Sequence, residues 1–331
     1  MLRVYGSAGQ RRHQIGDPSA IGEARRDARR LAAHLSLDET TSGRIGVVVT
    51  ELATNILRHG GGGDLLLQAL PTANGTTVEV LAVDRGPGMD DVEQCLQDGY
   101  SSGGGTLGTG LGAVRRMAAE FDLYSVNARG TVVMARVGEP AARFGAVSTA
   151  KGGETVCGDA WRMASGEYSQ TALVVIDGLG HGPSAAEAAQ KAADSFSANP
   201  FEPPARQIER AHQALASTRG AAVACAAWDA ARALSYAGIG NIAGRLCGPG
   251  GNQGLVSHNG TLGFQMRRVQ QFNYPLSENA LLIMHTDGLS ARWDLDDHEG
   301  LRFRHPAVIA ATLHRDHSRG RDDSTIVVTA A

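Results

Sequence analysis

Apolar positions near the start of the chain recur at helical spacing. Asp17-Pro18-Ser19 predicts a helix start, with Asp17 as the N-cap and Pro18 in the first turn, and the helix continues to about Leu35. Asp38 opens a second helix that is predicted to reach about Arg58. Its apolar residues form one continuous face, which predicts packing along the whole helix. That face consists of Ile45, Val48, Val49, Leu52 and Ile56.

The segments that follow have the length and apolar content of β-strands. Strands are predicted over residues 64–70, 76–83, 122–127 and 131–137. The first two are joined through residues 71–75, whose Pro, Asn and Gly predict a hairpin turn. A short helix is predicted over residues 113–120. Helices and strands in this order predict a mixed α/β unit.

In the second half of the chain, apolar strands run into acidic residues. Residues 173–176 lead into Asp177-Gly178, and residues 281–284 lead through His285 and Thr286 into Asp287-Gly288. Asp322-Asp323 precedes a further strand over 326–329, and Asp159 lies upstream. An ordinary turn would explain one Asp-Gly pair. The repetition instead indicates carboxylate oxygens gathered around hard divalent cations.

Composition limits the classes of function that remain. The chain has 331 residues, enough for two domains, and its 42% hydrophobic and 20% charged residues are typical of globular proteins. A net charge of −3 gives no reason to expect nucleic acid or an anionic membrane as partner. The four cysteines lie far apart, and no apolar run approaches 18 residues. We therefore expect a cytoplasmic protein with free thiols and no membrane segment.

The first half also carries candidate chemistry. Glu51, Asn55 and His59 recur every fourth residue and so share one stripe of the second helix. Asp84 ends a strand beside Gly86 and Gly88. Residues 101–112 are rich in glycine and open into a helix, where exposed N–H groups can bind phosphate oxygens. Taken alone, that loop fits a flexible linker equally well.

These motifs in this order resemble the GHKL (Bergerat) ATP-binding fold, and within it the anti-sigma-factor serine kinases of the RsbT and RsbW type. Residues 51–59 resemble the asparagine box, and residues 84–89 the first glycine box. The resemblance implies that Asn55 holds Mg²⁺ on the phosphates of ATP or ADP and that Asp84 binds the adenine amine. It also implies that Glu51 polarises the attacking serine hydroxyl or a water. The glycines implied in nucleotide binding are Gly86, Gly88, Gly108, Gly110 and Gly112.

The second half resembles the SpoIIE-like branch of metal-dependent (type 2C) serine/threonine phosphatases, with RsbX as the nearest type. The resemblance implies two Mn²⁺ or Mg²⁺ ions, with Asp177 bridging them as the central catalytic ligand and the Gly178 carbonyl as a further ligand. It also implies Asp159, Asp287 and Asp322 as ligands, and favours Asp322 over Asp323. Oxygen-only ligands suit these ions better than Zn²⁺. Without metal, carboxylates so close would repel each other and raise the pKa of one or more.

Two histidines in the same motifs have open roles. His181 could contact phosphate or support a ligand, or it could shape the glycine turn around it. For His285 a structural or supporting role is the better interpretation.

Together the motifs predict two α/β domains. Residues 1–138 form a GHKL sandwich, 139–147 a Pro- and Gly-interrupted linker, and 148–331 an αββα phosphatase sandwich. The favoured function is a partner-switching regulator that dephosphorylates, and by its kinase half phosphorylates, a STAS-domain protein. A sigma factor or response regulator is a further candidate partner, and relatives suggest a homodimer. Two alternatives stay open: a phosphatase that only senses ATP, and a binding protein that sequesters a sigma factor or STAS partner.

Overall fold

A computed structural model describes residues 2–6, 10–97, 110–167, 169–266 and 268–331. Two compact units make up the chain, and both are discontinuous in sequence. The N-terminal unit consists of Gly9–Ala142 and Gly300–Thr312. The C-terminal unit consists of Met1–Ala8, Arg143–Glu299 and Leu313–Ala331. A single helix, α7 (Pro306–His317), contributes residues to both units.

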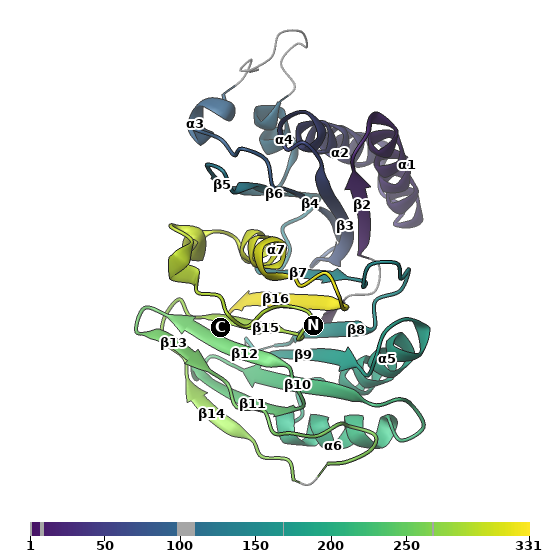
Figure 1. The fold of residues 1–331 in the computed structure, drawn as a ribbon, viewed down its shortest axis with the longest axis vertical. Coiled ribbons are helices and arrows are strands. Elements are labelled where there is room, and N and C mark those ends of the chain that lie inside the picture. Colours follow the sequence, from purple (N-terminus) through teal and green to yellow (C-terminus); the bar gives the residue numbers. More distant parts are fainter. Residues whose placement is uncertain (1, 7–9, 98–109, 168, 267) are drawn as a thin grey trace. The chain divides into compact units, whose positions relative to one another are not determined.

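The N-terminal unit is one antiparallel sheet with helices on one face (Figure 1). The strand order is β2-β3-β4-β6-β5, and α2 packs on β3, β4 and β6 while α1 packs on α2. The strands are β2 (Arg11–Ile15), β3 (Gly63–Pro71), β4 (Thr76–Asp84), β5 (Glu120–Val126) and β6 (Gly130–Val137). The helices are α1 (Pro18–His34), α2 (Glu39–His59), α3 (Val92–Cys95) and α4 (Leu111–Met117).

Both long helices begin where local capping predicts. Asp17 accepts hydrogen bonds from the amides of Ser19 and Ala20, and Asp38 accepts one from Thr41. The predicted apolar face of α2 is buried in the core between helices and sheet. Strand β2, with the polar sequence RRHQI, was not predicted, because its pairing with β3 leaves no apolar pattern to detect.

The C-terminal unit contains two sheets, as predicted for a phosphatase sandwich. The six-stranded sheet has the order β1-β8-β9-β10-β11-β14, and the five-stranded sheet β13-β12-β15-β16-β7. Helices α5 (Pro183–Ala198) and α6 (Pro204–Ala214) pack on the six-stranded sheet and share a core rich in alanine with it. One 3₁₀ helix spans Leu295–Asp297, and a second, Leu301–Phe303, falls in the residues that group with the N-terminal unit. The strands are β1 (Arg3–Gly6), β7 (Phe144–Thr149), β8 (Asp159–Ser165), β9 (Thr171–Gly178), β10 (Ala221–Trp228), β11 (Ala233–Ile239), β12 (Ala243–Gly248), β13 (Gly251–Gly254), β14 (Phe272–Pro275), β15 (Leu281–His285) and β16 (Ser324–Ala330).

The unit limits differ from the domains expected at residues 1–138 and 148–331. Strand β1 pairs with β8 in the C-terminal unit, and its Tyr5 ring lies 4.9 Å from that of Phe144. Residues 300–312 group with the N-terminal unit. The expected linker at 139–147 already contains the start of β7 at Phe144. Four-residue strands carry too little local pattern for a sequence to assign them to a sheet, since only pairing decides.

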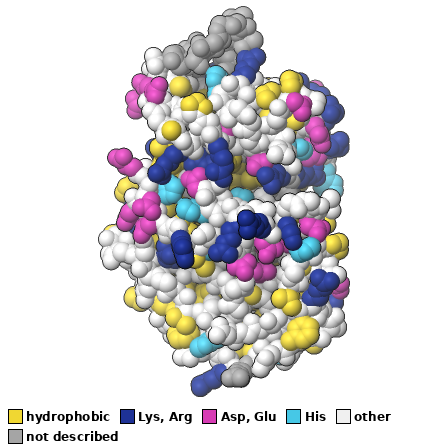
Figure 2. Space-filling model, viewed as in Figure 1, with side chains coloured by type: hydrophobic (Ala, Val, Ile, Leu, Met, Phe, Trp, Pro, Cys, Tyr) yellow, Lys and Arg dark blue, Asp and Glu magenta, His cyan; other side chains and the backbone are white. Residues whose placement is uncertain are grey.

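The surface shows no segregation of charge on the face drawn in Figure 2, where basic and acidic side chains lie interspersed. This agrees with a net charge of −3. Within the described ranges, no helix combines the length and the apolar character needed to span a bilayer.

A buried ion pair lies within the N-terminal sheet. Arg136 of β6 donates from Nε to Glu79 of β4 at 2.8 Å, and both side chains are fully buried. Gln68 of β3 donates to the other Glu79 oxygen. Arg136 also donates to Glu120 and to the carbonyl of Ala142. A buried charge is tolerated when its partners are complete, and it is costly when one partner is removed.

Replacing Arg136 by Met is therefore expected to destabilise the protein by about 3–5 kcal/mol, because Glu79 is left as an uncompensated buried charge. Urea unfolding followed by circular dichroism measures the loss. The matched control is Arg12→Met, which breaks the exposed pair with Asp64 and should cost less than about 1 kcal/mol. Equal losses in the two variants would contradict the assignment.

Candidate functional site

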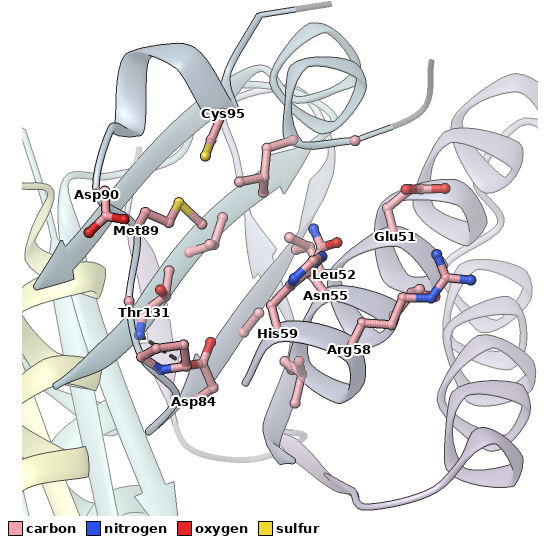
Figure 3. Close-up of a pocket in the computed structure, with 18 of the residues that line it drawn as sticks. Glu51, Leu52, Asn55, Arg58, His59, Asp84, Met89, Asp90, Cys95 and Thr131 are labelled. Carbon is pink, nitrogen blue, oxygen red and sulfur yellow. Dashed lines mark hydrogen bonds between the residues drawn. The ribbon is translucent and has the colours of Figure 1, made fainter. Parts of the chain in front are cut away.

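A cavity of about 530 Å³ opens in the N-terminal unit between α2, the end of β4 and the segment that follows it (Figure 3). Small-molecule sites commonly have this size. Its walls hold both carboxylates and apolar side chains, as a site for a polar ring compound requires. The lining residues are Glu51, Leu52, Thr54, Asn55, Ile56, Arg58, His59, Ala82, Asp84, Pro87, Gly88, Met89, Asp90, Asp91, Gln94, Cys95, Gly110, Leu111, Thr131 and Val133.

Asp84 is oriented in this cavity by two backbone amides. Its Oδ1 accepts hydrogen bonds from the N–H of Gly86 at 2.9 Å and of Thr131 at 3.1 Å. A carboxylate held in this way is preorganised to accept a hydrogen bond from an amine group of a ligand. Thr131, at the start of β6, was missed by sequence reasoning. Its place beside the end of β4 depends on the pairing of β6 with β4, which the sequence does not reveal.

The glycines around Asp84 are required by close packing. A Cβ at Gly86 would lie 2.7 Å from the His59 carbonyl oxygen, and one at Gly88 (φ +81°) 2.4 Å from that of Val126. A Cβ at Gly130 (φ +88°) would lie 2.2 Å from the Asp84 carbonyl oxygen. Gly88 also lines the cavity. The first glycine box therefore brings two strand ends together at Asp84.

Helix α2 supplies the opposite wall. Glu51 and Asn55 are one turn apart and both line the cavity, as their spacing predicts (Figure 3). Arg58 and His59 line it as well, which adds a positive charge to the wall. Arg58 was not predicted as a site residue from the sequence. Its position, one helical turn after Thr54 and Asn55, would have placed it on the same face of α2.

Residues 108–112, which resemble the second glycine box of the GHKL fold, are described only in part. Gly110 is the N-cap of α4 and lines the cavity, and Gly112 is buried within that helix. Helix α4 begins at Leu111, two residues earlier than predicted. Gly108 lies outside the described residues.

The acids of the C-terminal unit gather at the ends of its central strands. Asp159 begins β8 and stands directly opposite Asp177 in β9. Burial, followed by the charges of Asp287, Asp322 and Asp323, raises the pKa of Asp177 to about 7. Burial, followed by the charge of Asp177, also raises the pKa of Asp159 well above its usual value. The predicted ligands thus lie close enough to repel one another.

Two hydrogen-bond donors hold the aspartate side chains at these strand ends in place. Thr286 donates to Asp159 at 2.8 Å, and Asn241 donates to Asp287 at 2.6 Å. Among the described residues no three His, Cys, Asp or Glu side chains already surround one metal position. The donor set nevertheless fits a hard divalent cation, because it consists of mutually repelling oxygen ligands.

Asp323 has a different role from its neighbour Asp322. Its Oδ1 accepts from the Lys151 amide at 2.8 Å and its Oδ2 from the Gly158 amide at 2.9 Å, and the side chain is buried. Asp322 is exposed. Asp323 thus ties residues 151–158 to the start of β16, and Asp322 stays the predicted ligand of the pair. Two adjacent acids give no sequence signal for that difference.

Glycines again allow the strand ends to approach. A Cβ at Gly178 would lie 2.2 Å from the Ala185 carbonyl oxygen, and one at Gly288 1.9 Å from that of Asp323. The Gly178 amide donates to the Gly158 carbonyl at 3.1 Å. The Asp-Gly motifs are therefore needed for backbone packing around the acids as well as for any ligand.

His285 is structural, in agreement with the preferred interpretation. Its Nδ1 donates to the Thr286 carbonyl at 2.9 Å, and its Nε2 accepts from Trp293 at 3.2 Å. Burial lowers the pKa of His285. Both ring nitrogens are occupied in the neutral form, so His285 supports the strand end that carries Asp287.

The raised carboxyl pKa values make metal-free stability depend on pH. In the unfolded chain the Asp177 pKa is near 3.8, against about 7 in the folded protein. The folded state therefore retains a proton that the unfolded state releases, and stability falls as pH rises through that interval. In EDTA, Tm should be lower at about pH 8 than at about pH 5, and Mn²⁺ should restore it at the higher pH.

The Asp177→Asn variant provides the control, because it lacks the titrating group and should show a smaller pH dependence in EDTA. A wild-type Tm that rises between these two pH values, or that Mn²⁺ leaves unchanged, would contradict the interpretation.

Comparisons with known proteins match both halves. Residues 16–137 match the family model of the histidine kinase-like ATPase domain, and residues 167–330 match that of stage II sporulation protein E (SpoIIE). The serine/threonine-protein kinase RsbT of Bacillus subtilis (strain 168) is 35% identical over 115 residues, which cover 35% of this chain and 86% of RsbT.

Two solved structures each resemble a little over half of this chain. One is described as "The bacterial stressosome: a modular system that has been adapted to control secondary messenger signaling", with 26% identity and a TM-score of 0.53, covering 56% of this chain and 97% of that one. The other is RsbX in complex with magnesium, with 24% identity and a TM-score of 0.50, covering 55% and 92%.

The resemblance predicted from the motifs is confirmed in both halves. The GHKL-like motifs fall within the first family match, and Asp177, Asp287 and Asp322 fall within the second. The chain belongs to the histidine kinase-like ATPase family through its RsbT-like half, which is fused to a SpoIIE-type serine/threonine phosphatase domain.

Proposed function

We propose that the protein is a bifunctional partner-switching regulator. Its C-terminal unit removes phosphate from serine or threonine of a STAS-domain protein, and its N-terminal unit transfers the γ-phosphoryl group of ATP to the same class of partner. One observation carries the proposal: a cavity lined by Glu51, Asn55 and Asp84 and a cluster of interacting aspartates occur in one chain.

The N-terminal cavity fits an adenine nucleotide with Mg²⁺. Asp84, already oriented by the amides of Gly86 and Thr131, would accept from the adenine amine. Asn55 would hold Mg²⁺ on the phosphates, and Arg58 adds a positive charge on the same wall. Glu51 would accept the proton of the attacking serine hydroxyl.

The C-terminal cluster would hold two Mn²⁺ or Mg²⁺ ions through Asp159, Asp177, Asp287 and Asp322, with Gly178 adding its carbonyl. When bound, such ions supply charge neutralisation at the phosphate and a nucleophile from water. The chain's own part is to keep the acids close at the strand ends, despite their repulsion, through Thr286 and Asn241. RsbX, which shares this fold, is described in complex with magnesium.

The relatives suggest the class of partner. RsbT is a serine/threonine-protein kinase and one similar structure is a stressosome protein, which supports a STAS-domain antagonist in a bacterial sigma-factor or stress pathway. A sigma factor or response regulator as further partner, a homodimer and a cytoplasmic location belong to the same proposal.

Two alternatives keep the phosphatase but change the role of the other unit. The N-terminal unit could only sense ATP, or it could sequester a sigma factor or STAS protein. The position of Glu51 in the cavity wall beside Asn55 favours phosphoryl transfer, because a sensor has no need of a base there.

The test uses the purified full chain with Mn²⁺ and a STAS-domain protein in phosphorylated and unphosphorylated form. Phosphate release from the first and label transfer from γ-labelled ATP to the second are the expected results. Release without transfer would leave a phosphatase with an ATP-sensing or binding unit. If the protein carried out neither of the two reactions, the proposal would be overturned.

A further inference from the structure

Two large hydrophobic side chains are exposed beside the aspartates of the C-terminal unit. Leu179 is 53% exposed and Phe264 is 66% exposed. Leu179 comes two residues after Asp177, so their Cα atoms lie within about 7 Å of each other. Exposed apolar side chains that gather inside a polar rim indicate a binding surface.

Gly220 brings Leu179 and Phe264 together. The Leu179 amide donates to the Gly220 carbonyl at 3.0 Å. A Cβ at Gly220 (φ +81°) would lie 2.9 Å from Cδ2 of Phe264, so the aromatic ring lies directly on this glycine. Gly220 immediately precedes β10, which pairs with β9 (Figure 1). The two side chains therefore border the strand end that carries Asp177.

Phe264 is exposed on a backbone that is held in place. Thr261 donates its amide to the Gln265 carbonyl at 3.2 Å, and Gln265 donates to the Thr261 carbonyl at 3.0 Å, which closes a short turn around Phe264. Leu262, in the same turn, is fully buried in the alanine-rich core. The ring is thus presented by an ordered turn, and little conformational freedom of this segment is lost when a partner binds.

A positive charge lies on the same surface. Arg219 is exposed and precedes Gly220. Its Nη1 lies 3.1 Å from the position of a Cβ at Gly180, so the guanidinium packs beside the residue that follows Leu179. A guanidinium offers paired N–H donors to phosphate oxygens. This surface is therefore complementary to a segment that carries both a phosphate and an apolar side chain.

We propose that Leu179 and Phe264 form a docking patch for an apolar side chain that flanks the phosphoserine of the protein substrate, and that Arg219 attracts the phosphate. This role rests on the proposed phosphatase function. An extended chain covers about 3.3 Å per residue. An apolar residue within about three positions of the phosphoserine can therefore reach the patch while the phosphate lies at the aspartates.

Two phosphoserine peptides test the docking patch, one with leucine on both sides of the phosphoserine and one with serine there. The purified full chain with Mn²⁺ is expected to prefer the leucine peptide by about 10-fold in kcat/KM, because burying one leucine side chain strengthens binding by at least about that factor. In Phe264→Ser the preference should fall below about 2-fold, through a higher KM for the leucine peptide at an unchanged kcat.

Two further variants separate the parts of the surface. Leu179→Ser should reduce the preference as Phe264→Ser does, while the Mn²⁺ concentration for half-maximal increase in Tm stays the same. Arg219→Gln should raise KM for both peptides by about 5-fold and leave the preference intact, since both peptides carry the phosphate. Phe303→Ser is the matched control, because Phe303 is 81% exposed among the residues that group with the N-terminal unit. It should change neither peptide's turnover.

Several results would overturn the docking patch. Equal kcat/KM for the two peptides in the wild type would mean that no apolar neighbour is recognised. Equal loss on both peptides in Phe264→Ser would mean that Phe264 supports the strand ends. A preference that survives in Phe264→Ser would place recognition elsewhere, and a simultaneous halving of the mass in solution would show that the patch joins two copies of this chain. A wild-type protein inactive on both peptides would instead overturn the phosphatase function itself.

Discussion

Asp177→Asn is expected to lower dephosphorylation by more than about 1,000-fold, because a neutral ligand removes several kcal/mol of transition-state stabilisation at a two-ion site. Asp177 stands opposite Asp159, and Asp287, Asp322 and Asp323 all raise its pKa. Mn²⁺-dependent release of phosphate from a phosphorylated STAS-domain protein is the measurement.

The variant should fold, since Asn removes the repulsion that destabilises the metal-free cluster at neutral pH. Its Tm in EDTA at about pH 8 is therefore expected to equal or exceed that of the wild type. ATP binding by the N-terminal unit should be unchanged. Asp194→Asn, which makes the same charge change at an exposed position of α5, is the control. Retained Mn²⁺-dependent turnover in Asp177→Asn would remove Asp177 from the metal site.

Asn55→Ala is expected to abolish the reactions that need ATP and to spare hydrolysis of p-nitrophenyl phosphate. Asn55 lies one helical turn after Glu51 and lines the cavity opposite Asp84. Losing the Mg²⁺ ligand should reduce label transfer from γ-labelled ATP by more than about 100-fold, since phosphoryl transfer depends on metal-held phosphates. ATP affinity, measured by calorimetry with Mg²⁺, should fall as well.

Asn74→Ala controls for the loss of an amide in the same unit, because Asn74 lies exposed in the turn between β3 and β4. It should leave ATP binding and transfer unchanged. Wild-type transfer in Asn55→Ala would contradict the assigned role. If Asn55→Ala also slowed hydrolysis of p-nitrophenyl phosphate, nucleotide binding would affect the phosphatase, and the two activities would not be independent.

The predictions that depend on residues close together in the sequence agree best with the structure. The helix starts at Asp17 and Asp38 depend on side chains that cap amides two or three residues away, so the sequence contains all the partners. The strands that end at Asp84 and Asp177 were found for a similar reason, since a run of apolar residues followed by Asp-Gly or Asp-Arg-Gly is a local pattern.

The partners of the site residues were harder to find, because they come from distant strands. Thr131 donates to Asp84 across 47 residues, and Gly158 donates to Asp323 across 165. Strand register decides the first contact, since β6 pairs with β4, whereas the second joins the residues before β8 and β16, two strands of different sheets. Asp323 differs from Asp322 because it accepts the amides of Lys151 and Gly158, which are distant in the sequence.

By itself the sequence determined the two families, the order of their motifs and the residue types at both sites, because these depend on local patterns and on the chemistry of carboxylates, amides and glycines. Only the tertiary structure decided that β1 joins the sheet of the C-terminal unit, that Arg136 and Glu79 pair in a buried sheet, and that Glu154 meets His181. Each of these results joins segments far apart in the chain, and pairing energies between such segments appear only once the chain is folded.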